Sequence, residues 1–175
     1  IIKNDLNISF ENTQLILTLY FTFLVFGQIL SGPFSDKYGR KPILLLGASI
    51  YSISAFFASL STNIEILLIL RCFQGFGAAA CLSVGRTILS DCYEIKEAAK
   101  EMSKMTAIMA VIPISCFIFG GFLAEFLGWR TNLIALGIIS LILIIAMSLL
   151  LNETLTKKAE SISFKNMFMV YRGLI

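Results

Sequence analysis

The 175-residue sequence contains no histidine and carries little charge. Without imidazole the chain cannot form a Ser-His-Asp or Cys-His catalytic site or the common zinc sites that need histidine, and we expect neither an enzyme nor a metal centre. Only 14% of its residues are charged, against about 25% in soluble proteins. The net charge of +3 is too small to favour nucleic-acid binding, so no nucleic-acid partner is expected.

Long uncharged segments dominate instead, and hydrophobic residues make up 57% of the chain. Four uncharged runs cover residues 12–35, 42–64, 105–124 and 131–152, and a fifth, 66–90, is interrupted only by Arg71 and Arg86. Each run is long enough for a helix that crosses a ~30 Å hydrocarbon layer, which needs about 20 residues. We predict an all-α, polytopic transmembrane helix bundle in residues 1–155, with five spans at about 13–31, 43–60, 64–89, 105–124 and 131–151.

The basic residues predict the orientation of the spans, because cytoplasmic connections are enriched in Lys and Arg. Connections on one side contain only Lys3 and Arg130. Those on the other side contain Lys37, Arg40, Lys41, Lys96, Lys100, Lys104, Lys157, Lys158, Lys165 and Arg172. We therefore expect the 32–42 loop, the 91–104 loop and the C-terminus in the cytoplasm, and the first residues outside. An odd number of spans with the first residues outside predicts a preceding helix. Residues 156–175 are interpreted as a cytoplasmic linker between two halves or the start of another span.

Small residues and the single proline within a span predict how the helices pack. The helix-packing candidates are Gly77, Gly85, Pro113, Gly120 and Gly121. The four cysteines match no redox or zinc spacing, so we expect them to pack as small apolar residues without disulfides. The last span is almost entirely aliphatic and is expected to be the most lipid-exposed one.

Two segments carry recognisable motifs. Residues 32–44 read GPFSDKYGRKPIL and resemble the motif between the second and third helices of major facilitator superfamily transporters. The matching residues are Gly32, Asp36, Gly39, Arg40, Lys41 and Leu44. Residues 67–79 resemble the fourth-helix motif of the same superfamily, through Leu67, Arg71, Gln74, Gly75, Gly77, Ala78 and Ala79.

Three further stretches, 85–91, 128–130 and 153–155, resemble the bicyclomycin-resistance-type (Bcr/CflA) drug:proton antiporters. The fifth-helix antiporter pattern is incomplete, because Cys116 and Phe117 stand where Gly-Pro is usual and Pro113 comes three residues early. The resemblance nevertheless covers essentially the whole chain.

This resemblance implies helices two to six of a twelve-helix transporter, a partial N-terminal half of the major facilitator fold. The first helix and the C-terminal half would then be missing partners of these five helices, with another chain as one candidate source. The five-helix chain alone is not expected to transport. The implied function is proton-coupled efflux of small hydrophobic compounds or drugs by alternating access. The implied setting is the lipid bilayer of the bacterial inner (plasma) membrane, with the proton gradient as energy source and no cofactor. The alternative is an inactive remnant or membrane interaction protein left by truncation or gene splitting.

The resemblance also implies roles for particular residues. A cytoplasmic conformational lock would contain Gly32, Asp36, Gly39, Arg40, Lys41 and Asp91. We expect Asp36 within a few Å of Arg40 or Arg86, with Asp91 nearby; ordinary loop charges are the alternative interpretation. Proton coupling or a polar cavity would involve Arg71, Gln74 and Gly75. Arg71 is expected to face the bundle, and a snorkelling or structural arginine is the alternative.

Overall fold

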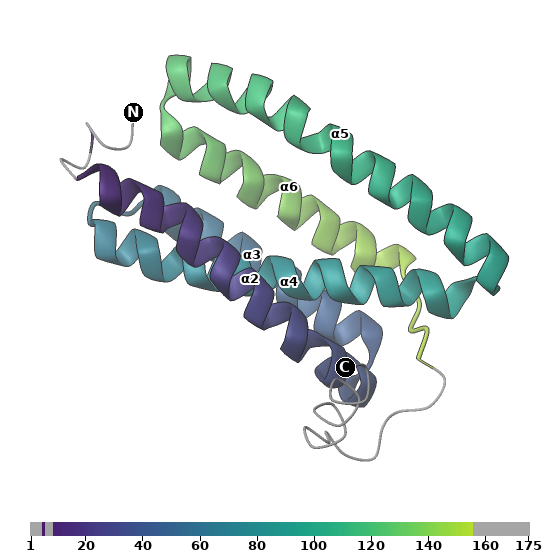
Figure 1. Ribbon diagram of the computed structural model, residues 1–175. Coiled ribbons are helices and arrows are strands. Elements are labelled where there is room, and N and C mark those ends of the chain that lie inside the picture. The colour runs from purple at the N-terminus through teal and green to yellow at the C-terminus, as the bar shows by residue number, and fades with distance from the viewer. Residues whose placement is uncertain (1–4, 6–8, 156–175) are drawn as a thin grey trace, which may run out of the picture.

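A computed structural model describes residue 5 and residues 9–155, which include five long helices (Figure 1). They are α2 (Phe10–Tyr38), α3 (Arg40–Ser59), α4 (Ile64–Cys92), α5 (Ile95–Leu127) and α6 (Trp129–Leu150). All five are long and apolar enough to cross a membrane. The all-α fold with five candidate spans is therefore confirmed, while residues 156–175, for which a linker or a further span was predicted, lie outside the described residues.

All five helices are longer than the predicted spans, because charged residues at their ends remain helical. The clearest correction concerns the expected loop at 32–42, since α2 continues through Pro33 as far as Tyr38. Proline removes one backbone donor, but membrane helices tolerate it where neighbouring groups compensate. The fourth span was predicted at about 105–124, and α5 extends beyond it at both ends, from Ile95 through Pro113 to Leu127.

Single glycines make two of the turns. Gly39 separates α2 from α3 and adopts a φ of 113°, a conformation that residues with a Cβ rarely reach. Its N–H also closes α2 by donating to the Ser35 carbonyl at 3.0 Å. Gly128, with a φ of 87°, makes the equivalent turn between α5 and α6, which lie side by side in Figure 1.

Helix α4 packs closely against both α2 and α3. A Cβ at Gly75 would collide with the backbone carbonyl of Tyr20 in α2. On the α3 side, a Cβ at Gly77 would stand 2.5 Å from the Gly47 carbonyl. Without side chains at these positions the helix backbones approach each other, which is the main source of packing between helices in lipid. Gly77 therefore lies in a helix contact, as the sequence predicted.

Two serine hydroxyls join α3 to α6 across a buried contact. Ser52 Oγ donates to the Gly137 carbonyl at 3.0 Å, and Ser140 Oγ donates to the Ala48 carbonyl at 3.2 Å. Both serine side chains are buried. Each bond gives a hydroxyl a partner that hydrocarbon cannot provide, so the pair favours this contact over exposure to lipid.

The end of the bundle where α2 begins contains an apolar core cluster around the single tryptophan. Its buried members are Ile16, Ala58, Leu67, Trp129 and Leu133. The carboxylate of Asp5 accepts a hydrogen bond from Trp129 Nε1 at 3.0 Å and another from Arg130. These two donors hold the pKa of Asp5 below its usual value. Arg130 also donates to the Ser61 carbonyl at 3.2 Å, so it links the α5–α6 and α3–α4 turns.

Helix α5 lies at the edge of the bundle, where α6 is its main neighbour (Figure 1). No residue in its most apolar stretch is buried, whereas 17% of the corresponding stretch of α6 is. Helix α5 is thus more exposed than α6 among the described residues, because α6 packs between α3 and α5. That the last span faces lipid most stays a prediction. Aliphatic composition cannot distinguish the two cases, since side chains facing lipid and side chains facing another helix are equally apolar.

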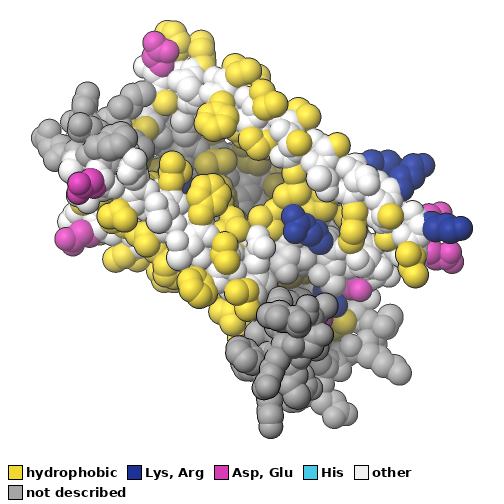
Figure 2. All heavy atoms as spheres, in the orientation of Figure 1, with side chains coloured by type: hydrophobic (Ala, Val, Ile, Leu, Met, Phe, Trp, Pro, Cys, Tyr) yellow, Lys and Arg dark blue, Asp and Glu magenta, His cyan; other side chains and the backbone are white. Residues whose placement is uncertain are grey.

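Hydrophobic side chains are spread along the helices in Figure 2, and charged side chains gather mainly toward the ends. The turn at Gly39 and the end of α4 lie at one end of the bundle, because Arg40 contacts Asp91 there. The structure thus brings together the basic segments at 32–42 and 91–104. The side of the membrane that this end faces remains a prediction.

The contact at Gly75 can be tested with alanine. We expect Gly75→Ala to destabilise the bundle by about 1–3 kcal/mol, because its Cβ would press on the Tyr20 backbone and force α2 away. Unfolding by SDS in detergent micelles, followed by fluorescence of Trp129, which is 6% exposed, measures the change.

Gly85→Ala is the matched control on the same helix. Among the described residues, no heavy atom outside the adjoining part of α4 lies within 4 Å of its added Cβ. Alanine favours a helix over glycine by about 1 kcal/mol, so this variant should be as stable as the wild type or more so. Equal destabilisation by the two substitutions would contradict the close approach of α2 and α4.

Candidate functional site

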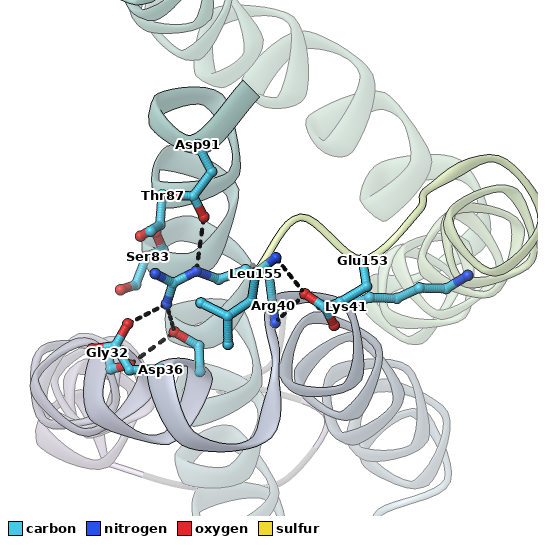
Figure 3. Close-up of polar contacts among 10 residues, drawn as sticks. Gly32, Asp36, Arg40, Lys41, Ser83, Thr87, Asp91, Glu153 and Leu155 are labelled. Carbon is cyan, nitrogen blue, oxygen red and sulfur yellow. Dashed lines mark hydrogen bonds and ion pairs between the residues drawn. The ribbon is translucent and has the colours of Figure 1, made fainter. Parts of the chain in front are cut away.

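Arg40 stands at the centre of a charged cluster at the turn between α2 and α3 (Figure 3). Its Nε donates to Asp91 Oδ2 at 3.0 Å, and its Nη1 donates to Asp36 Oδ1 and to Ser35 Oγ, the latter at 2.7 Å. The Arg40 side chain is only 9% exposed, against 27% for Asp91 and 53% for Asp36. A buried guanidinium is thus paired with two carboxylates and a hydroxyl.

Local structure explains how these groups meet. Asp36 is in the last turn of α2 and Arg40 is the first residue of α3, so the Gly39 turn brings them together. Ser35 is fully buried and its hydroxyl also donates to the Gly32 carbonyl at 2.8 Å. Asp91 reaches the cluster from the last turn of α4. The expected proximity of Asp36, Arg40 and Asp91 is therefore present, with Arg40 rather than Arg86 as the shared partner.

A residue that was not predicted for the site, Glu153, approaches the same turn from beyond α6. Its carboxylate accepts hydrogen bonds from the backbone N–H of Arg40 at 2.9 Å and of Lys41 at 3.2 Å (Figure 3). The Lys41 ammonium in turn donates to the Ser148 carbonyl at 2.8 Å. Burial alone acts to raise the pKa of Glu153, but these donors and those of Leu155 and Thr154 hold it below its usual value.

Arg71 and Gln74 form the polar pair within α4. Arg71 Nη1 donates to Gln74 Oε1 at 3.0 Å, and the Gln74 side chain is fully buried. Arg71 lies seven residues after Ile64, the first residue of α4, which is about 10 Å along the helix. Among the described residues, Arg71 Nε and Gln74 Nε2 have no hydrogen-bond partner although both atoms are buried. Arg71 therefore faces the bundle and retains unused donors.

The other predicted residues are not gathered at one site. Gly75 is in the contact with α2 rather than in a polar cavity, because Tyr20 lies against it. A Cβ added at Gly32, Gly85 or Gly121 would face open space among the described residues. Gly85 and Gly121 were predicted to lie in helix contacts, and the described helices place no such contact at them. Gly120 joins α5 to α6 through its carbonyl, which accepts from Asn132 Nδ2 at 2.9 Å.

An open apolar groove of about 450 Å³ is lined in part by residues of α4 that are close in sequence to Arg71 and Gln74. It is lined by Phe23, Ile50, Ile69, Cys72, Phe73 and Phe76. Its walls come from α2, α3 and α4, and none of these side chains carries a charge. The groove suits a hydrophobic molecule or a lipid chain by its shape and apolarity.

The fold and these features define a multi-pass membrane protein with a charged cluster at one end and a half-buried arginine, Arg71, within a span. The sequence model of the family described as "Major Facilitator Superfamily" matches residues 1–169. The chain belongs to this superfamily of transporters.

Several relatives have names that refer to drug resistance. The Bicyclomycin resistance protein homolog of Haemophilus influenzae is 30% identical over 90% of this chain and 39% of its own length. The Chloramphenicol resistance protein of Pseudomonas aeruginosa is 32% identical over 77% of this chain and 32% of its own length. The Uncharacterized MFS-type transporter YdgK of Bacillus subtilis is 37% identical over 88% of this chain and 39% of its own length. The chain thus spans less than half the length of these relatives.

The lowered pKa of Glu153 predicts how acid affects the bundle. The carboxylate stabilises the fold fully above its usual pKa of 4.5 and loses this effect as the pH falls through the lower value of the folded state. SDS unfolding of the wild type should therefore become easier as the pH falls below 4.5, and Glu153→Gln should show a shallower dependence. Parallel curves for the two proteins between pH 3 and 6 would show that Glu153 is not bound in this way.

Proposed function

We propose that this chain belongs to a proton-driven transporter that exports small hydrophobic compounds by alternating access. Membership of the superfamily and the names of the relatives support export of drug-like compounds. The observation that carries the proposal is the cluster in which Arg40 joins the α2–α3 turn to the end of α4.

The cluster suits a conformational lock because it depends on short, directional bonds between separate helices. Charge-assisted hydrogen bonds are stronger than neutral ones and lose much of their energy when their geometry changes. Asp91 belongs to α4, whereas Asp36 and Arg40 belong to the α2–α3 turn. A movement of α4 relative to that turn would therefore break the bond between Arg40 and Asp91, and the cluster would favour one state of the transporter over another.

The unused donors of Arg71 and Gln74 support a polar function inside the membrane. An arginine at mid-membrane costs about 2.5–3.5 kcal/mol on insertion scales, so a wet cavity or a further partner is expected beside it. We assign Arg71 to proton coupling or to the electrostatics of the transport cavity, with Gln74 holding its guanidinium. The apolar groove lined by Phe73 and Phe76 supports a hydrophobic substrate.

The test uses the complete reading frame that encodes this sequence, expressed in a bacterium without its own efflux pumps. We expect lower susceptibility to hydrophobic drugs and export of a fluorescent dye that stops when a protonophore collapses the proton gradient. Asp36→Asn should slow export by up to about fivefold, because the Asp36 carboxylate is 53% exposed and an exposed ion pair is worth up to about 1 kcal/mol.

Glu97→Gln provides the control, since Glu97 is an exposed acid in the first turn of α5. It changes the charge as Asp36→Asn does and should leave export unchanged. Quantified membrane insertion of each variant separates loss of export from loss of folding. Susceptibility equal to that of cells without the protein would contradict the export function, and export that persists with the protonophore would contradict proton coupling.

A further inference from the structure

The first turn of α3 lacks a side-chain cap of its own, because its N-cap residue is Gly39. An α-helix leaves four N–H groups at its start without partners inside the helix. Here the Gly39 N–H bonds to the Ser35 carbonyl, and Pro42 has no N–H to satisfy. The two that remain, on Arg40 and Lys41, both donate to Glu153. One carboxylate, 113 residues away along the chain, therefore completes the start of α3.

The Gly39 turn also leaves room for this carboxylate. A Cβ at Gly39 would stand 2.5 Å from Glu153 Oε2, closer than two such atoms can approach. A glycine is thus needed here for two separate reasons: the positive φ of the turn and the space that Glu153 occupies.

The contact between α3 and α6 at this end is reciprocal. Glu153, which follows α6, supplies negative charge to the positive start of α3, and Lys41 of α3 supplies positive charge to the end of α6. The Lys41 ammonium does so through the carbonyl of Ser148, in the last turn of α6. Both placements are favourable for the helix dipoles. The ends of the two helices are therefore held together by bonds in both directions.

These bonds bear on the charged cluster through one residue. Arg40 uses its backbone N–H for Glu153 and its guanidinium for Asp36 and Asp91. We propose that Glu153 is a positioning residue, which by holding the start of α3 keeps the Arg40 guanidinium between its two carboxylates and links α6 to the cluster. The inference rests on the proposed function, because the cluster is the proposed lock. A displacement of the end of α6 would then move Arg40 and weaken its bond to Asp91.

A double-mutant cycle on the full chain in detergent micelles tests the proposal without a transport measurement. Glu153→Ala and Asp91→Asn are made singly and together, and SDS unfolding is followed by the fluorescence of Trp129. Loss of the cap alone should raise the unfolding constant about fivefold. Because Glu153 and Asp91 would act through the same guanidinium, the effect of Asp91→Asn should be at least threefold smaller in the Glu153→Ala background.

Glu101→Gln is the control partner for the cycle. Glu101 pairs with Lys104 on α5, in an ion pair that does not include Arg40. Its effect should be the same with and without Glu153. Glu153→Gln keeps one acceptor oxygen, so Asp91→Asn should recover part of its effect on the unfolding constant in this background. Glu153→Gln also replaces Glu153→Ala in the cycle if the alanine variant does not insert.

The outcomes separate this inference from the proposed function. If Asp91→Asn has the same effect in both backgrounds, Glu153 is only a helix cap and the positioning role is overturned, whether or not the protein exports drugs. If the two substitutions are coupled and Glu153→Ala slows dye export in cells, both proposals are supported. If they are coupled and the wild type exports nothing, the positioning role stands and the export function fails.

Discussion

Hydrocarbon offers no hydrogen-bond partners, so every backbone polar group within the membrane must be satisfied by the helix that carries it. Apart from the carbonyls freed by Pro33 and Pro113, this constraint leaves unsatisfied groups at the helix ends, and the turns at Gly39 and Gly128 reduce two connections to a single residue each. Such a turn has no loop residues to cap the following helix. The start of α3 is completed instead by Glu153, and the same turn places Arg40 beside Asp36. The charged cluster thus follows from how the helix ends are satisfied.

The helices are held together by close approach rather than by apolar burial alone. Lipid is as apolar as a leucine side chain, so burying leucine between helices gains little. The contacts of α4 with α2 and α3 therefore depend on Gly75 and Gly77, where the backbones nearly touch. Helix α5 lacks such contacts on most of its length and remains at the edge with its aromatic side chains exposed. The closest helix contacts therefore surround α4, the helix that carries Arg71 and Asp91.

The sequence predicted what local spacing and charge determine. The number of spans could be found from the uncharged runs. The meeting of Asp36, Arg40 and Asp91 at one end of the bundle was expected from the resemblance to the transporter motifs. The role of Glu153 at the α3 start could not, because its partners are backbone N–H groups that leave no mark on the sequence. One signal was available: a helix that starts after glycine and has proline in its first turn needs an acceptor from elsewhere. The exposure of α5 could not be inferred from the sequence, because its composition is that of a packed membrane helix.

The two carboxylates on Arg40 are not equivalent. Asp36 is 53% exposed and shares the α2–α3 turn with Arg40, so water competes for its bond and the turn keeps it nearby when that bond breaks. Asp91 is 27% exposed and comes from α4, so its bond is better protected from water and can be lost when α4 moves away. Separation of α4 from the turn would leave the Arg40 guanidinium with Asp36 as its one carboxylate partner, and without Asp36 it would be an unpaired charge, which is more costly. In the proposed lock, the bond to Asp91 is therefore the one that would oppose separation of the helices, and the bond to Asp36 would limit its cost.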